Sequence, residues 1–415
     1  MRKLSKFLFF SLLAALPVNL GYHFIITQAY AGGLLIDYLI PTIFLPDIVA
    51  TFLIGAWALE RNFKNDLKSL LSKRYFAIAV WFLFVMFLSL FMSNRFLPSA
   101  TFFTRTFLYT GVMLYASLRF DYARDLKIYA NIIAVTTLAL GILGILQYSF
   151  QGSVFDNYLI LGEQPYSANT PSISKENVLG HTKVPAYGLF RHPNIFGGIL
   201  SIYLVIIVFL HYLISPKIFR MVVLFGSFAL LFTFSYFSWI SFGIGLLIYF
   251  LGRTGTFLAR AFVLSAFVFS FFIPVFRFLS ASENPSIYRR SNLLDASYKI
   301  VKSDYLFGVG INNSVVLLEK NIPWTRDIRF VQPVHNIYAL LVLEIGIIGL
   351  LLFLSLFYTG FSKLKSNTLF LQAALLQIIF LGCFDHYFVT IHQPWLLLWL
   401  TLGIVLNVSD LQDHV

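Results

Sequence analysis

The chain has 415 residues, of which 59% are hydrophobic and only 12% are charged, and its mean hydropathy is +0.80. This composition indicates a polytopic membrane protein and excludes a soluble enzyme held by a single anchor. The formal net charge of +12 would also suit a nucleic-acid-binding protein. No nucleic-acid-binding motif accompanies it, so we attribute the charge to cytoplasmic loops and to contact with anionic membrane lipid.

The apolar residues gather in about twelve runs, and each is expected to form a transmembrane helix because a span needs roughly 20 such residues. The expected fold is an all-α polytopic membrane protein, with residues 1–415 forming a single integral membrane domain. The seventh and eighth runs are the least clearly separated, since only a Ser-Tyr-Phe-Ser segment lies between them. In chain order the runs are 6–26, 34–59, 75–93, 100–118, 126–150, 193–213, 218–235, 237–251, 258–278, 334–358, 366–382 and 386–406.

The first run, 6–26, follows a basic start and has the general form of a secretory signal peptide. Its apolar stretch is too long for such a peptide, and no small-residue cleavage pattern follows it. A retained first helix is therefore expected.

Lys and Arg flank the runs unevenly, and this predicts an orientation because cations near spans are retained in the cytoplasm. With a cytoplasmic N-terminus, the basic segments 2–6, 61–74 and 119–127 all lie inside, and both termini are cytoplasmic. Two long loops, 151–192 and 279–333, are then outside. Long loops translocate regardless of charge, so the cations in these two loops need a reason other than topology.

The loop 279–333 contains a segment that predicts an amphipathic helix on the outer membrane surface, with Leu294 and Tyr298 on its apolar line. Arg290 lies one turn before Leu294 on the same face. Guanidinium suits phosphate because it donates paired hydrogen bonds and stays charged. Arg290 is the candidate phosphate ligand and Arg289 its alternative, and the competing interpretation is an arginine that simply lies beside anionic lipid.

A Gly-Val-Gly turn, Gly308 to Gly310, follows this segment. Glycines there are expected to end the helix and to permit a close backbone approach, as in phosphate loops. A bare GxG is a weak signal, however. Asn312, just beyond the turn, is a further polar candidate in the same loop.

His335, followed by Asn336, stands at the start of the run 334–358 and is the candidate catalytic residue. A histidine at a span boundary is often only an interfacial residue. An imidazole with a pKa of about 6.5 is nevertheless suited to removing a proton from an acceptor hydroxyl. Glu344 lies two turns further on and would orient this helix through a hydrogen bond or an ion pair.

Two other polar segments lie beside apolar runs. Arg191 and His192, followed by a proline and Asn194, form either a helix N-terminal cap or part of an anion site. Asp385 and His386 lie in an expected outer turn and either line an acceptor cavity or cap the last helix.

In the second loop, Arg290 is followed by LLDASYKIVKSDYLFGVGINNS and then by VHNIYALLVLEIGIIGLLLFL. This order resembles the signature region of the O-antigen ligase and O-antigen polymerase superfamily, bacterial membrane glycosyltransferases that use polyprenyl-diphosphate-linked glycans. Earlier, GLFRHPNIFGGIL, from Gly188 to Leu200, resembles the family's Arg-then-Pro-Asn segment at the end of its first outer loop. The helical plan with a large late outer loop agrees with the family as well.

The resemblance implies a metal-independent transfer outside the cytoplasmic membrane. The family's histidine matches His335, its loop arginine matches Arg290, and the asparagine after the histidine matches Asn336. The family usually has Ser-Arg where this chain reads TFSYFSWISFGIG, and Tyr236 occupies the place of that arginine. Either the Arg-His pair that ends the first loop supplies the missing cation, or diphosphate binding differs here, or the activity is weakened.

The expected function is transfer of a glycan from a polyprenyl diphosphate to an acceptor hydroxyl in cell-surface polysaccharide biosynthesis, at the outer face of the bacterial cytoplasmic membrane. A ligase would use a lipid core or another surface acceptor, a polymerase would use another lipid-linked repeat, and the sequence does not separate them. A flippase for the same lipid-linked glycan would predict inverted repeats and broken helices, which the sequence does not reveal. A glycan-binding module without chemistry is a third alternative.

No metal or other cofactor is expected. The outer loops offer no carboxylate pair, no HExxH and no clustered His/Cys spacing, and the single cysteine, Cys383, excludes a thiolate cluster. Arg290 and Arg191 would then stabilise the departing diphosphate. If His335 acts directly on the acceptor, the reaction is a single displacement with inversion at the anomeric carbon.

Overall fold

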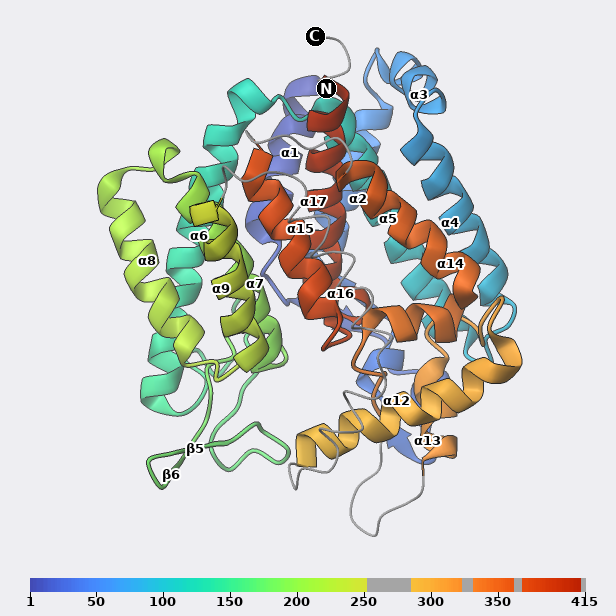
Figure 1. The fold of residues 1–415 in the computed structure, drawn as a ribbon, viewed down its shortest axis with the longest axis vertical. Helices are drawn as coiled ribbons and strands as arrows, with labels where there is room; N and C mark the ends of the chain where they lie inside the picture. Colours follow the sequence, from blue (N-terminus) through green and yellow to red (C-terminus); the bar gives the residue numbers. More distant parts are fainter. Residues whose placement is uncertain (252–284, 323–330, 362–367, 412–415) are drawn as a thin grey trace.

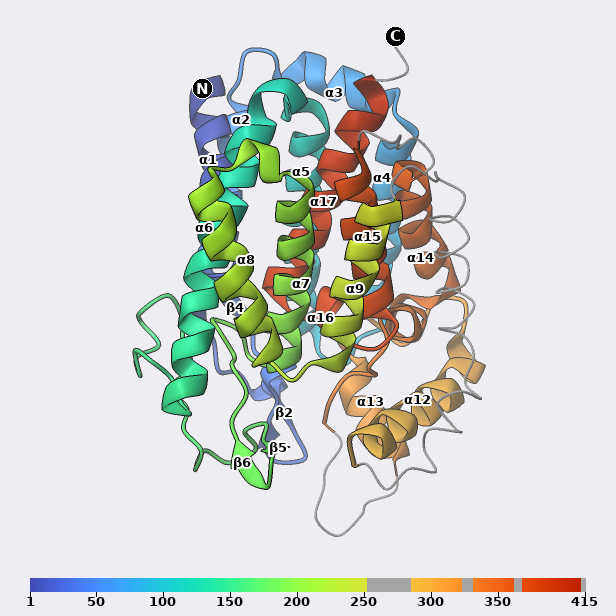
Figure 2. The same ribbon diagram turned by 60° about the vertical axis from the view of Figure 1, so that its left-hand side comes forward.

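The computed structural model describes residues 1–251, 285–322, 331–361 and 368–411 of the chain. These residues are mainly helical (Figures 1 and 2). The α-helices are α1 (Arg2–Ala15), α2 (Leu45–Ala58), α3 (Phe63–Leu71), α4 (Arg74–Leu90), α5 (Phe96–Arg119), α6 (Tyr122–Phe150), α7 (Pro193–Phe209), α8 (Pro216–Leu231), α9 (Tyr236–Leu251), α12 (Pro285–Asp304), α13 (Ser314–Asn321), α14 (Ile337–Phe361), α15 (Leu369–Gly382), α16 (Tyr387–Thr390) and α17 (His392–Leu411).

Short antiparallel hairpins and single turns of 3₁₀-helix connect some of these helices. The strand pairs are β1 (Gly21–His23) with β4 (Thr42–Phe44), β2 (Tyr30–Ala31) with β3 (Leu34–Leu35), and β5 (Glu176–Val178) with β6 (His181–Lys183). The 3₁₀ turn η2 (Asp37–Leu39) lies between β3 and β4.

The long helices lie side by side, and the two ends of the bundle differ (Figures 1 and 2). The start of α1 and the end of α17 lie at one end. The β5–β6 hairpin, α12 and α13 lie at the opposite end. This arrangement agrees with the expectation that both termini face one side of a membrane and that the two long loops face the other.

The first two apolar runs are shorter as helices than the sequence predicted. Helix α1 ends at Ala15, not near 26, because Pro17 has no amide hydrogen with which to continue the helical hydrogen bonds, and the chain then enters β1. Helix α2 starts only at Leu45, where the Asp47 carboxylate accepts a hydrogen bond from the Phe44 amide at 3.1 Å and caps the first turn. The residues before it form η2 and the hairpins instead.

Within the described residues, α6 and α14 are each long and apolar enough to cross a membrane. The pair α3 and α4, bent by 88°, passes the same test together. The twelve-span count is therefore not established and stays a prediction, and the run 258–278 lies outside the described residues. Large apolar side chains such as Trp81, Phe107 and Phe250 are exposed on α4, α5 and α9, as helices facing lipid would require.

Helix α14 is broken at Gly346, which has φ 71° and ψ 178°. A loop from the α12 side closes on the break: the Val309 amide donates to the Leu343 carbonyl at 2.8 Å, and the Ile347 amide donates to the Tyr305 carbonyl at 2.8 Å. These bonds replace the intrahelical bonds that the break removes. The loop after α12 is thereby attached to the helix that begins beside His335.

The expected amphipathic helix is present as α12, which lies across the end of the bundle near α13 and the start of α14 (Figure 1). Leu294 is buried against the protein, whereas Tyr298 is half exposed. Because α12 packs on α14, its position relative to His335 is determined by tertiary contacts.

Candidate functional site

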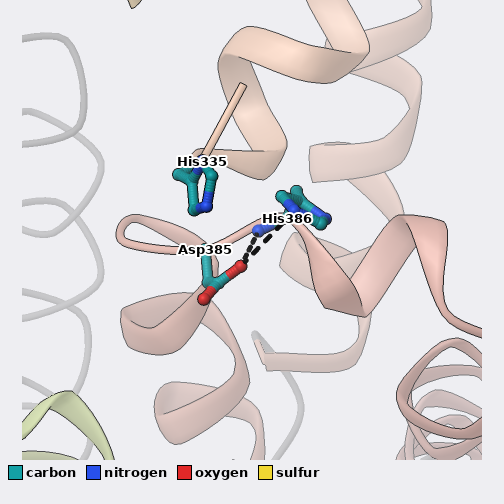
Figure 3. A group of neighbouring side chains, drawn as sticks. All are labelled: His335, Asp385 and His386. Atoms are coloured by element: carbon teal, nitrogen blue, oxygen red, sulfur yellow. Dashed lines mark hydrogen bonds and ion pairs between the residues drawn. The ribbon is translucent and has the colours of Figure 1, made fainter. Parts of the chain in front are cut away.

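Three ionisable side chains meet where α14 begins and α15 ends. One ligand atom each from His335, Asp385 and His386 lies within 4.8 Å of the other two (Figure 3). The two imidazoles meet edge to face, with ring centroids 4.9 Å apart. His386 Nε2 is 3.8 Å from Asp385 Oδ1. We call these three residues the histidine cluster.

Asn336 holds the two sides of the cluster together. Its Oδ1 accepts hydrogen bonds from the amides of Tyr338 and Ala339 at 2.9 Å each, which caps α14. Its Nδ2 donates to the Cys383 carbonyl at 3.0 Å, at the end of α15. One side chain thus both starts the helix after His335 and ties it to the segment that carries Asp385.

Thr390 holds the imidazole of His386. Its hydroxyl oxygen lies 2.7 Å from Nδ1 of the ring, and the hydroxyl also lies 3.3 Å from the His386 carbonyl oxygen. Nε2 is therefore the ring nitrogen that faces Asp385.

Helix α7 supplies the other contacts of Asp385. Asn194 Nδ2 donates to Asp385 Oδ2 at 3.3 Å. His192 is the N-cap of α7, and its Nδ1 accepts from the Asn194 amide at 3.2 Å. The sequence left open whether this segment caps a helix or belongs to a binding site. The structure shows that both can hold: His192 caps α7, while Asn194 contacts Asp385.

Arg290 approaches the cluster from α12. Its guanidinium lies over the ring of Phe237, 5.5 Å from the centroid, and Phe237 stacks on Phe384 at 4.1 Å. Arg290 Nε and His335 Nδ1 are both buried, and neither has a hydrogen-bond partner among the described residues. Both side chains therefore keep unused hydrogen-bonding capacity within the described residues.

The charges of the site follow from burial and neighbours. Burial lowers the pKa of His335 well below its usual value, and Arg290 lowers it further, while Asp385 opposes the shift. Burial alone would raise the pKa of Asp385, but the imidazoles and Arg290 outweigh it and hold that pKa low. Burial likewise lowers the pKa of His192. Near neutral pH the site therefore combines one carboxylate, one guanidinium and neutral imidazoles.

Arg191 pairs with a residue outside the histidine cluster. Its Nη1 is 4.0 Å from Oδ2 of Asp37, an exposed residue of η2. Tyr38, the next residue, places its ring edge to face with His386 at 5.4 Å. Tyr38 therefore lies between the Arg191–Asp37 pair and the cluster.

The Gly-Val-Gly turn contacts protein backbone. Gly308 and Gly310 both have positive φ, and a Cβ would lie 2.5 Å from the Glu344 backbone at the first and 2.6 Å from the Ser93 amide at the second. Glu344 accepts hydrogen bonds from the Asn312 amide at 2.9 Å and from the Ser314 hydroxyl at 2.6 Å. Of the two interactions considered for Glu344, the structure contains the hydrogen bond.

Two other candidates lie apart from these contacts. Tyr236, at the start of α9, is 62% exposed and touches Trp239 edge to face at 5.2 Å. The neighbouring Phe237 is the residue that contacts Arg290. Arg289 is half-buried on α12.

A polar cavity of about 40 Å³ lies behind the cluster and is too small for a sugar ring. Tyr38 and Thr390, which both touch His386, line it together with Arg105, Asn312 and Glu344. It has room for a few water molecules and for nothing larger.

Sequence reasoning weighed Asp385 and His386 without linking them to His335, and it missed Tyr38, Phe237 and Thr390. The adjacent Asp-His pair between two apolar runs was the available signal. The sequence shows no closely spaced histidines, and a histidine cluster was therefore not expected. The fold nevertheless brings His335, Asp385 and His386 together.

Residues 221–354 match the family model described as O-antigen ligase. The matched stretch contains Arg290 and His335, whereas Asp385 and His386 follow it in the chain. No curated protein and no solved structure matches the chain. This match over residues 221–354 supports the O-antigen ligase and O-antigen polymerase superfamily, a group of glycosyltransferase-like enzymes.

Proposed function

We propose that the protein transfers a glycan from a polyprenyl diphosphate to an acceptor hydroxyl at the outer face of the bacterial cytoplasmic membrane. The observation that carries the proposal is the grouping of a buried imidazole, His335, with the Asp385 carboxylate, in the electrostatic field of the Arg290 guanidinium. The O-antigen ligase match supports the choice of a lipid-linked glycan as donor. The exposed apolar residues on the outer helices support an integral membrane location.

In this mechanism His335 acts as the general base. Its neutral nitrogen takes the proton of the acceptor hydroxyl while the oxygen attacks the anomeric carbon of the donor. The bond between that carbon and the diphosphate oxygen breaks in the same step, so the configuration at the carbon is inverted. Asp385 stabilises the imidazolium that forms, because a carboxylate favours the charged ring.

Arg290 stabilises the leaving group. The departing diphosphate gains negative charge, and a positioned guanidinium binds its oxygens without needing a metal ion. The stacked rings of Phe237 and Phe384 hold Arg290 in place beside the cluster. Arg191 lies beyond Tyr38, which suits contact with a more distant part of the donor or with the acceptor. Arg289 remains the alternative cation on α12.

The test is product formation by purified protein in lipid, supplied with a defined polyprenyl-diphosphate glycan and with either a lipid-core acceptor or a second lipid-linked repeat. Mass spectrometry of the product distinguishes ligation from polymerisation. Replacing His335 with alanine should lower the rate about 10²- to 10⁴-fold while donor binding persists. His181→Ala, on the exposed β6 strand, is the matched control and should keep full activity. Near-normal turnover by His335→Ala would end the general-base assignment.

A further inference from the structure

The histidine cluster presents three metal-ligating atoms to one point. Two are imidazole nitrogens and one is a carboxylate oxygen, from His335, His386 and Asp385. In a tetrahedral zinc site the ligand atoms lie about 2.0–2.2 Å from the ion, hence roughly 3.3 Å from one another. His386 Nε2 and Asp385 Oδ1 are already 3.8 Å apart, and all three atoms lie within 4.8 Å. Small side-chain rotations would close the remaining gap.

The surroundings orient two of the three ligands. Thr390 occupies Nδ1 of His386 at 2.7 Å, so Nε2 is the ring nitrogen left facing Asp385. Asn194 donates to one carboxylate oxygen of Asp385, Oδ2, and the main-chain amide of His386 donates to the other, Oδ1, at 2.8 Å. These two bonds hold Oδ1 beside Nε2 of His386. Such outer hydrogen bonds fix the ligands of metal sites in this way. The third ligand, His335, has its Nδ1 buried without a hydrogen-bond partner in the described part of the chain.

We propose that the histidine cluster binds a divalent transition-metal ion of the zinc type, and that the bound ion inhibits glycan transfer. Two nitrogen ligands and one oxygen favour Zn²⁺, Cu²⁺ or Ni²⁺ over Mg²⁺ or Ca²⁺. An ion on the ring of His335 occupies the lone pair that would accept the proton of the acceptor. The binding site stands on the geometry alone, whereas the inhibition rests on the proposed function.

Removing the charge of Arg290 is a second test of the metal site. Its positive charge acts on the same three side chains and shares the Asp385 carboxylate with any bound ion. Removing that charge should strengthen metal binding. A variant that merely disturbs the fold would weaken binding instead, so an increase is specific to the proposed site.

The binding experiment uses purified full-length protein, free of any histidine tag, without substrate. Zn²⁺ is titrated against a coloured chelator, and Co²⁺ is added separately to record its visible absorption. Wild-type protein and His181→Ala should bind one equivalent of Zn²⁺, and the Co²⁺ bands should indicate four-coordination. His335→Ala, Asp385→Asn and His386→Gln should each lose the stoichiometric binding. Thr390→Val should bind roughly 10- to 100-fold more weakly, as removal of an outer hydrogen bond does in metal sites, and Arg290→Gln should bind more tightly.

The transfer assay then adds Zn²⁺ or Mg²⁺ to wild-type protein. Zn²⁺ should inhibit and a chelator should restore activity, while Mg²⁺ has no effect. Wild-type protein that binds no Zn²⁺, binding that survives all three ligand substitutions, or transfer that requires the ion would each overturn the proposal. A protein that binds Zn²⁺ at the cluster yet transfers no glycan would refute the proposed function and leave the metal site standing.

Discussion

The side-chain amide of Asn336 donates a hydrogen bond to the main-chain carbonyl of Cys383 at 3.0 Å, across 47 positions of the sequence. His335 immediately precedes the first residue, and Asp385 follows the second by two positions. This one bond therefore sets the separation between the imidazole and the carboxylate of the site.

Asn336→Asp tests this bond separately from the helix cap. Aspartate keeps the oxygen that caps α14, but it loses the amide donor and turns an oxygen toward the Cys383 carbonyl. The rate of transfer should fall about 10²-fold, the loss typical of a misplacement of about 1 Å, and thermal stability should fall as well, because a buried carboxylate oxygen then faces the Cys383 carbonyl. Asn131→Asp is the control, because Asn131 Nδ2 also donates to a distant carbonyl, that of Leu213, away from the site. Equal activity in both variants would contradict the role of the bond.

Arg290→Lys should be clearly impaired although the charge is kept. An ammonium cannot reproduce the paired hydrogen bonds of a guanidinium or its stacking over Phe237. Steady-state kinetics with varied donor should show at least about a tenfold loss in kcat/KM, the cost of roughly one charge-assisted hydrogen bond. Arg220→Lys, on the exposed face of α8, should behave as wild type. Chelators should not reduce wild-type activity, and activity that returns only with magnesium or manganese would refute the arginine mechanism.

Asp385→Asn should change the pH profile in a defined direction. The carboxylate raises the pKa of His335, so its removal lowers that pKa further below the usual value. His335 must be neutral to act, so the acid limb of the profile should move to lower pH. The weaker base should also give a lower plateau rate. Asp156→Asn, in the exposed first loop, is the control. An acid limb that moves to higher pH would exclude Asp385 as the group that supports His335.

Gly346→Ala should destabilise the protein. At φ 71° and ψ 178° only glycine is unstrained, and a Cβ would lie 2.0 Å from the Leu306 carbonyl oxygen. The loss of unfolding free energy should be about 2 kcal/mol or more, measured by thermal unfolding in detergent. Gly243→Ala places its methyl group in open space on α9 and should be neutral or slightly stabilising. Equal stability of the two variants would contradict the break in α14.

Cysteine labelling in a Cys383→Ser background tests the topology. Leu179, 95% exposed in the first loop, and Tyr305, half exposed after α12, should react as cysteines from outside the cell. Leu71, exposed at the end of α3, should react only after permeabilisation. Asn313 is unsuitable for this test because its side chain is buried. Labelling of Leu179Cys only from the cytoplasmic side would invert the model and separate the site from its substrate.

Local properties of the chain were enough to predict the helical class and the helix that became α12, and motif order singled out His335 and Arg290 as candidates, whose roles stay predictions. Apolar length, helix-start residues and motif order all act over short stretches of sequence, so they are readable without a fold. The apolar pattern alone predicted the first two helices too long. Pro17 ends α1 early, and the Asp47 cap makes α2 begin only at Leu45.

Tertiary structure decided which polar residues meet. Asp385 and His386 join His335 only because Asn336 ties the start of α14 to the end of α15, and Arg290 reaches them through Phe237 and Phe384. The same packing sends Arg191 to Asp37 and turns the glycines after α12 toward the break in α14. Such contacts depend on how helices far apart in the sequence pack together. The spacing of residues along the chain does not indicate which of these helices become neighbours.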